Sequence, residues 1–231
     1  MPSILITGAN RGLGLEFARQ YAAAGWRVHA SCRDPERAET LAALAADADG
    51  RVTLHRLDVA DPAQIAALAD GLRGATIDLL LNNAGVYGGE RKTLGDIDYE
   101  RWVETLGINA LAPLRVSEAL LEQVARGDRR QLVFISSRMG SMAENTEGGS
   151  YVYRSSKAAL NAVVRSLACD LAGRGFTVVC FHPGWVATDM GSARAPLTPA
   201  ASVAGMRAVI ERLTPADNGG FFNYDGTKVP W

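Results

Sequence analysis

Residues 4–14 read ILITGANRGLG. An apolar run leads into a turn with three glycines, and a helix-forming segment follows, so this stretch predicts a strand, a tight turn and a helix. Glycines let backbone N–H groups approach a pyrophosphate closely, and the positive end of the following helix faces the same group. The turn is not a P-loop, because no Gly-Lys-Ser/Thr closes it, and a strict G-x-G-x-x-G pattern fails at Phe17. Its place in the first βαβ unit favours a dinucleotide-binding turn.

The rest of the chain alternates short β-branched or apolar runs with longer segments rich in Ala, Leu and Arg, which is typical of βαβ units on a parallel sheet. Strands are predicted at Ile4–Thr7, Arg27–Cys32, Val52–Leu57, Leu79–Leu81, Leu132–Ser136, Thr177–Phe181 and Gly220–Asn223. Helices are predicted at Leu13–Ala24, Pro35–Ala46, Pro62–Leu72, Tyr99–Ala125, Tyr151–Ala172 and Ala200–Leu213. We therefore expect an α/β fold of the Rossmann type: a doubly wound, seven-stranded parallel sheet with helices on both faces.

Two helix starts carry their own signal, since Asp34-Pro35 and Asp61-Pro62 each pair an acidic N-cap residue with a proline at the first helical position. No internal repeat, low-complexity segment or long linker is visible, so residues 1–231 are expected to form a single domain. Glycine and proline cluster in residues 184–199, which predicts a mobile substrate loop over a site.

The composition argues against several classes of partner. The 231 residues are 48% hydrophobic and 21% charged, with 24 Lys and Arg against 25 Asp and Glu, so no charge excess attracts nucleic acid or an anionic membrane. No apolar stretch approaches the roughly 18 residues of a membrane span, and the start MPSILI leaves no room for a signal peptide. Cys32, Cys169 and Cys180 show no C-x-x-C spacing, which fits a reducing compartment. We expect a cytoplasmic protein.

The end of the second strand indicates which nicotinamide cofactor the turn would hold. An acid there would hydrogen-bond the adenosine ribose and repel a 2′-phosphate, but the strand ends in Cys32-Arg33. Arg33 and Arg11 are therefore predicted to clamp a 2′-phosphate through charge-assisted hydrogen bonds. Asp34 opposes this interpretation, although its expected N-cap role gives it a structural function.

A catalytic pair is predicted in residues 151–172. Tyr153 and Lys157 lie four positions apart, which places the phenol and the ammonium on one face of a helix. A neighbouring cation favours the phenolate and lowers a tyrosine pKa from its reference near 10, so Tyr153 is a candidate proton donor and acceptor. Ser136 and Ser137 follow an apolar strand at the sheet edge where ligands bind, and either could orient a carbonyl.

Together these residues resemble the classical short-chain dehydrogenase/reductase family over essentially the whole chain. The resemblance rests on Thr7-Gly8-x-x-x-Gly12-x-Gly14, Asp58-Val59, Asn82-Asn83-Ala84-Gly85, Asn109, Ser137, Tyr153-x-x-x-Lys157 and Pro183-Gly184. A closer likeness is to C-factor and Sniffer-like carbonyl reductases, through ASCRDP (residues 30–35), ISSRMGS (135–141), YRSSKAALN (153–161), HPGWVATDMG (182–191) and the tail NYDGTKVPW (223–231).

The resemblance implies roles for these residues. Ser137 would orient the substrate, Tyr153 would act as acid and base, Lys157 would hold the nicotinamide ribose and lower the tyrosine pKa, and Asn109 would support a water relay to the lysine. The residues expected to bind NADP(H) are Gly8, Asn10, Arg11, Gly12, Leu13, Gly14, Arg33, Asp58, Val59, Asn83, Ala84, Gly85, Tyr153, Lys157, Pro183, Gly184, Val186 and Thr188.

One departure concerns the substrate side. Ser137 and Tyr153 lie 16 positions apart, and many family members have about three fewer. The insertion, around residues 142–149, is expected to enlarge a loop beside the substrate pocket, where Trp185 and Met190 are also candidate lining residues. The apolar rim favours a substrate that is not highly charged.

We therefore expect an NADP(H)-dependent oxidoreductase that reduces the carbonyl of a small ketone, aldehyde or quinone by hydride transfer, with Tyr153 as proton donor. The alternatives are a non-catalytic NADP-binding sensor or C-factor-like signalling protein, and a nucleotide-sugar epimerase on the same fold. His29, His55 and His182 are too dispersed for a metal cluster, so they are predicted to be satisfied structural histidines and no metal is expected. By resemblance, the two longest predicted helices pair into a homodimer or homotetramer.

Overall fold

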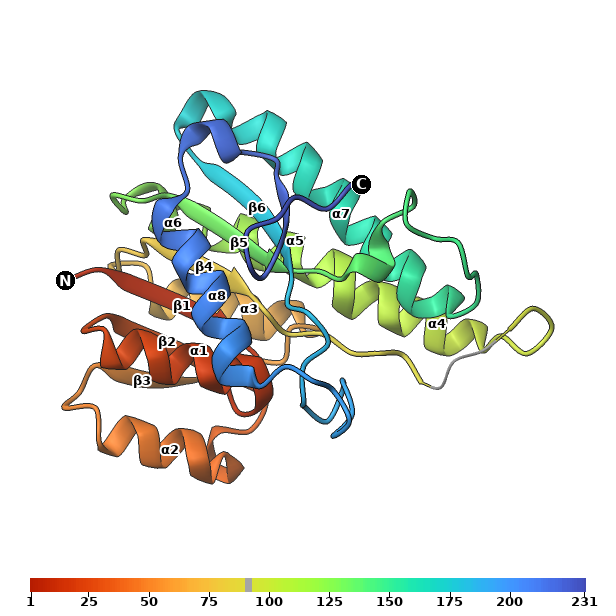
Figure 1. The fold of residues 1–231 in the computed structure, drawn as a ribbon. Coiled ribbons are helices and arrows are strands. Elements are labelled where there is room, and N and C mark those ends of the chain that lie inside the picture. The colour runs from red at the N-terminus through yellow and green to blue at the C-terminus, as the bar shows by residue number, and fades with distance from the viewer. Residues whose placement is uncertain (90–92) are drawn as a thin grey trace.

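The computed structural model describes residues 1–89 and 93–231, and among these residues one seven-stranded parallel sheet forms the centre of the molecule (Figure 1). The strands are β1 (Ser3–Thr7), β2 (Arg27–Cys32), β3 (Val52–Arg56), β4 (Leu79–Asn82), β5 (Gln131–Ile135), β6 (Thr177–His182) and β7 (Phe221–Asn223). They lie in the order β3-β2-β1-β4-β5-β6-β7. The chain winds outward from β1 and then, in the other direction, from β4, which confirms the predicted doubly wound fold.

Helices cover both faces of the sheet because side chains alternate along each strand. Ile4 and Ile6 of β1 belong to a buried cluster with residues of α1 (Gly12–Ala23), α2 (Glu39–Ala46) and α8 (Pro199–Arg212). Leu5, between them, belongs to a second cluster with residues of α3 (Pro62–Gly71), α5 (Ala112–Ala119), α6 (Leu121–Ala125) and α7 (Tyr151–Leu171). All five residues of β1 are buried, as expected for a parallel strand between two helical layers.

The long helix predicted over Tyr99–Ala125 is interrupted. It consists of α4 (Tyr99–Leu106), a π-helical turn (Gly107–Leu111), α5 and α6. Pro113 in the first turn of α5 has no N–H to donate backwards, and its ring would crowd the preceding carbonyls of a regular α-helix, so the wider turn accommodates it. The interruption matters because Asn109 lies in it.

The two predicted acidic N-caps differ. The Asp61 carboxylate accepts hydrogen bonds from the N–H groups of Ala63 and Gln64 at the start of α3, as predicted. The prediction for Asp34 is wrong: its side chain makes no capping hydrogen bond with the described residues and lies 3.9 Å from Arg37. Pro35 begins a 3-10 turn (Pro35–Arg37), and the α-helix starts only at Glu39.

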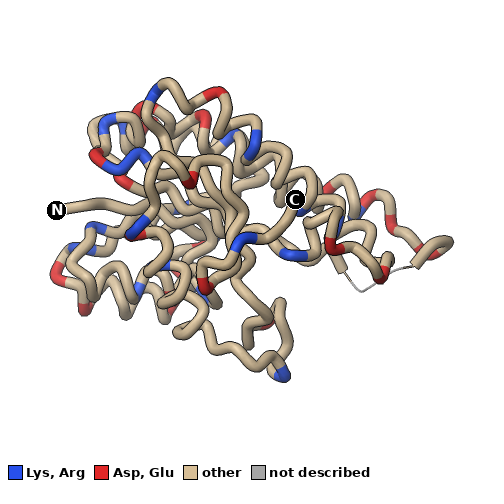
Figure 2. Tube along the Cα trace, turned by 45° about the horizontal axis from the view of Figure 1, so that its top comes forward, with Lys and Arg blue, Asp and Glu red and all other residues tan. Residues whose placement is uncertain are grey.

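Charged residues of both signs are interspersed over the helices and loops around the sheet (Figure 2). This distribution agrees with the near balance of 24 basic and 25 acidic residues. Within the described residues, no helix combines the length and apolar character needed to cross a bilayer.

The contrast between the two aspartates predicts a difference in stability. Asp61→Ala removes two hydrogen bonds from the first turn of α3 and is expected to lower the melting temperature by about 2–4 °C for a chain of this size. Asp34→Ala is the matched control and should change the melting temperature by less than about 1 °C. Thermal unfolding followed by circular dichroism measures both, and equal losses would contradict the assignment of the cap.

Candidate active site

A cavity of about 650 Å³ lies at the carboxyl ends of the strands. The predicted site residues that line it are Gly8, Asn10, Arg11, Gly12, Leu13, Gly14, Arg33, Asp58, Val59, Asn83, Ala84, Gly85, Ser137, Tyr153, Lys157, Pro183, Gly184, Val186 and Thr188. Asn109 is fully buried behind the wall. Residues far apart in the sequence therefore meet at one edge of the sheet, where parallel α/β folds bind ligands.

The glycine turn after β1 is held tightly against the loop after β4. The Thr7 hydroxyl accepts a hydrogen bond from the Asn83 N–H at 3.0 Å, and Asn83 Nδ2 donates to the carbonyls of Thr7 and Gly8 at 2.9 and 3.1 Å. A Cβ on Gly14 would lie 2.1 Å from the Gly8 carbonyl oxygen, and Gly8 has a φ of +68°. Only glycine fits either position, so the turn leaves its backbone and the start of α1 accessible to a phosphate.

The two arginines expected at the adenosine end differ in their partners. Arg33, at the end of β2, is exposed, lines the cavity and has no ion pair with any described residue. The Arg11 guanidinium pairs with the carboxylate of Asp189, so the glycine turn is connected to the loop of residues 184–199. The expected clamp of two free cations is therefore reduced to one, because Asp189 compensates the charge of Arg11.

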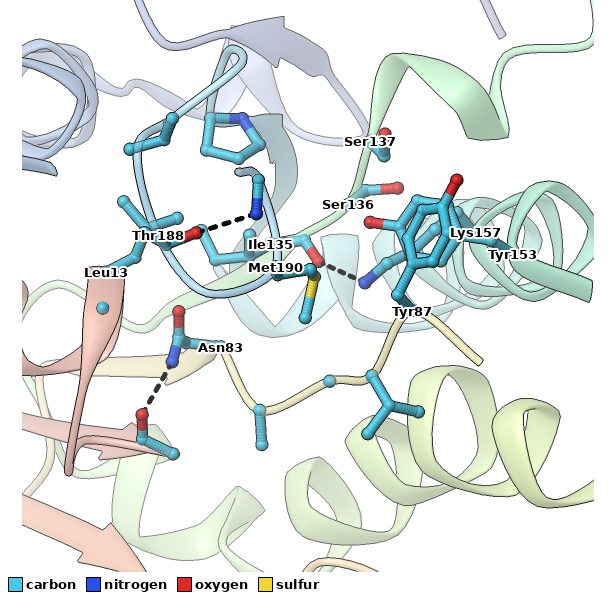
Figure 3. A pocket seen from close by; sticks show the side chains of 18 of the residues that line it. Leu13, Asn83, Tyr87, Ile135, Ser136, Ser137, Tyr153, Lys157, Thr188 and Met190 are labelled. Carbon is cyan, nitrogen blue, oxygen red and sulfur yellow. Dashed lines mark hydrogen bonds between the residues drawn. The ribbon is translucent and has the colours of Figure 1, made fainter. Parts of the chain in front are cut away.

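Tyr153 and Lys157 lie together on α7, as their spacing predicts (Figure 3). The Lys157 ammonium donates a hydrogen bond to the Ile135 carbonyl at 2.9 Å, and its nitrogen lies 5.9 Å from the centre of the Tyr153 ring. Both side chains are buried. Burial disfavours the charged form of each group and lowers the pKa of Lys157 to about 8.

The predicted lowering of the Tyr153 pKa is not found. Burial raises the pKa of Tyr153 to about 12, outweighing a hydrogen bond with Ser137, while the nearby phenol of Tyr87 raises it further. The ring of Tyr87 lies against that of Tyr153, with centroids 4.7 Å apart and an angle of 37° between the planes. In this arrangement the phenol is protonated at neutral pH, so it can donate a proton but is poorly prepared to accept one.

Asn109 connects the wall of the cavity to α7. Its Nδ2 donates to the Val86 carbonyl at 2.8 Å and to the Ser156 hydroxyl at 3.0 Å, and its Oδ1 accepts from the Val86 N–H at 2.9 Å. A Cβ on Gly85 would lie 3.1 Å from Asn109 Oδ1 and 3.5 Å from Lys157 Nζ. The π-helical turn thus brings Asn109 close to the lysine while its own hydrogen bonds hold the loop after β4.

The cavity contains residues that sequence reasoning missed. Tyr87, Arg138, Met139 and Arg154 line it, as do Glu144, Thr146 and Glu147 from the loop of residues 142–149. The predicted placement of that loop beside the pocket is confirmed, and Trp185 and Met190 line the cavity too. His182 also lines it, and its Nδ1 is buried without a partner among the described residues, so the prediction of a satisfied structural histidine is wrong.

Comparison with known proteins agrees with this arrangement. The chain belongs to the short chain dehydrogenase family, whose model matches residues 2–197. It is 50% identical to the C-signal of Myxococcus xanthus over 165 residues, which cover 71% of this chain and 99% of that protein. The structure of the carbonyl reductase Sniffer of D. melanogaster superposes with a TM-score of 0.94 at 33% identity, covering 100% of both chains. An NADPH-bound carbonyl reductase from chicken fatty liver gives a TM-score of 0.93 at 34% identity, covering 100% of this chain and 94% of the other.

The buried ammonium predicts a pH-dependent stability. Because the pKa of Lys157 is about 8 in the folded chain and 10.5 in the unfolded chain, the unfolded state binds more protons between these values. The lysine therefore costs most stability below pH 8, and the cost disappears as the pH rises to 10.5.

Lys157→Met removes this cost. The free energy of unfolding of the variant, relative to the original chain, should decrease from pH 7 to pH 10 by up to roughly 3 kcal/mol. Urea unfolding at both pH values measures the difference. A difference that is constant with pH would show that the lysine keeps its ordinary pKa in the folded chain.

Proposed function

We propose that this chain is an NADPH-dependent carbonyl reductase that converts the carbonyl of a ketone, aldehyde or quinone to an alcohol. The observation that carries the proposal is the buried pair of Tyr153 and Lys157, with the Ser137 hydroxyl beside the phenol, at one end of a cavity that begins at a glycine turn. The similarity to solved carbonyl reductases, one of them NADPH bound, supports the same activity.

The other end of the cavity fits the cofactor. The backbone of the turn around Gly12 and the start of α1 would hold the pyrophosphate, and Arg33 would hold the 2′-phosphate as a cation without a competing partner. Lys157 would hold the nicotinamide ribose, next to Tyr153. When bound, NADPH supplies the hydride that a carbonyl carbon accepts.

The residues of the chain would supply orientation and the proton. Ser137 donates a hydrogen bond to the substrate oxygen and holds it beside the phenol of Tyr153. Tyr153, protonated at neutral pH because its pKa is about 12, donates its proton to the oxygen as the alcohol forms. The phenolate that remains is stabilised by the Lys157 ammonium, and proton uptake from solvent restores the phenol.

A second candidate is a signalling protein or NADP sensor. The 50% identity to the C-signal of Myxococcus xanthus favours it. A sensor needs the cofactor end of the cavity but has no use for an acid–base group, whereas Tyr153, Lys157 and Ser137 lie together here. Oxidation of NADPH with a panel of neutral and charged carbonyl compounds separates the two candidates, since a sensor binds NADPH without turnover.

The proton donor is tested by Tyr153→Phe. The variant keeps the ring and its contact with Tyr87, so NADPH affinity should stay within about threefold, while kcat should fall by at least about 10³-fold because the proton is lost. Steady-state kinetics and fluorescence titration with NADPH measure the two quantities. Retained turnover would overturn the mechanism, and a parallel loss of NADPH affinity would point to a damaged fold.

The choice of cofactor is tested by Arg33→Asp. NADPH affinity should fall about tenfold or more, because a charge-assisted contact is lost and a repulsive charge is introduced, while NADH affinity should change less than about threefold. Arg37→Asp is the matched control: it makes the same charge change four residues away, outside the cavity. A preference for NADPH that survives Arg33→Asp would mean that other residues hold the 2′-phosphate.

A further inference from the structure

Arg154 carries a positive charge into the cavity without a partner. It follows Tyr153 on α7, is only partly exposed, and lines the cavity on the side of the loop of residues 142–149. Its Nε is shielded from solvent and has no hydrogen-bond partner, and its guanidinium makes no ion pair with any described residue. A partly buried cation without a partner is costly, which indicates that a ligand supplies the counter-charge.

Other arginines of the chain show the contrast. Arg207 also has a shielded Nε without a partner, but its guanidinium binds Gln20 at 3.2 Å and lies 4.6 Å from the centre of the Tyr21 ring. Arg138, the other arginine on the substrate side of the cavity, pairs with Glu144 at 3.0 Å. Arg154 has neither kind of compensation.

The acidic residues nearby do not take this role. Glu144 is engaged by Arg138, which leaves Glu147 as the other carboxylate that the insertion loop contributes to the cavity. Glu147 is exposed to solvent and makes no ion pair with Arg154 or any other described residue. Among the described residues on this side of the cavity, the guanidinium next to the candidate proton donor is therefore the positive charge without a counter-charge.

We propose that Arg154 binds an anionic group, a carboxylate or a phosphate, on the carbonyl substrate. The planar guanidinium can hold either group through two parallel hydrogen bonds. Because Arg154 lines the same cavity as Tyr153 and Ser137, one ligand could reach both the guanidinium and the groups that would hold its carbonyl. This inference names the substrate class of the proposed reductase, and it replaces the expectation of a substrate that is not highly charged.

The first test measures binding without chemistry. The NADPH-loaded protein is titrated by calorimetry with 4-(hydroxymethyl)benzoate and with its methyl ester, since an alcohol and the reduced cofactor cannot react. The acid should bind at least about tenfold more tightly than the ester. Arg154→Gln should remove this preference for the acid. Arg154→Lys should keep part of the preference, because the positive charge remains but the two parallel N–H donors of the guanidinium are lost. The phosphate arm uses 4-(hydroxymethyl)phenyl phosphate in the same way.

The control is Arg101→Gln. Arg101 is exposed on α4, pairs with Glu104 at 3.0 Å and does not line the cavity, so this variant should bind every probe as the original chain does. Equal binding of acid and ester, or binding of neither the acid nor the phosphate, overturns the proposal. It is also overturned if Arg154→Gln weakens NADPH binding by more than about threefold, since the guanidinium would then serve the cofactor.

Turnover separates this inference from the proposed function. If 4-carboxybenzaldehyde is reduced with a higher kcat/KM than methyl 4-formylbenzoate, and Arg154→Gln equalises the two, both proposals are supported. If the acid binds through Arg154 while no aldehyde is reduced, the anion site stands and the reductase activity fails. If the two aldehydes are reduced equally well by the original chain, the reductase activity stands and the anion site fails.

Discussion

The site depends on the contact between the glycine turn after β1 and the loop after β4. These strands are neighbours in the sheet, but the chain leaves them toward opposite edges, so a crevice opens between their carboxyl ends. The Thr7 hydroxyl and the Asn83 side chain hold the two loops together there, at a distance that only a glycine at position 14 permits. The same crevice is lined by residues after β2, β5 and β6.

Burial explains the electrostatics of Tyr153 and Lys157. It raises the pKa of Tyr153 and lowers that of Lys157, so both groups are pushed toward their neutral forms. A phenol with a raised pKa carries its proton at neutral pH. A lysine with a pKa of about 8 still carries its charge there. Arg154 lines the same cavity and is partly buried, so its unpaired guanidinium points to a ligand with a negative charge. An unpaired charge on an open surface would carry no such implication, because water solvates it.

The sequence predicted the strands and their alternation with helices, because each is encoded locally by a pattern of apolar residues, and it predicted the glycine turn that lines the cavity. It did not separate Asp34 from Asp61, since both precede a proline and the difference lies in the backbone after it. The π-helical turn at Asn109 was also missed, because the apolar pattern runs on through Pro113. Tyr87 and Arg154 were not predicted to line the site, because only the fold brings the loop after β4 and the start of α7 to one cavity.

Specificity would draw on loops of the chain that the proton transfer does not use. The groups that would transfer a proton are held at the sheet edge and on α7, where the Lys157 ammonium donates to the Ile135 carbonyl at the end of β5. The groups that would select a substrate come from Arg154 on α7 and from residues 142–149 and 184–199. Arg11 and Asp189 join the second of these loops to the glycine turn by an exposed ion pair. A change in these loops can alter the charge and shape of the pocket while the donor stays in place, so substrate identity must be sought in the cavity wall and cannot be taken from the family.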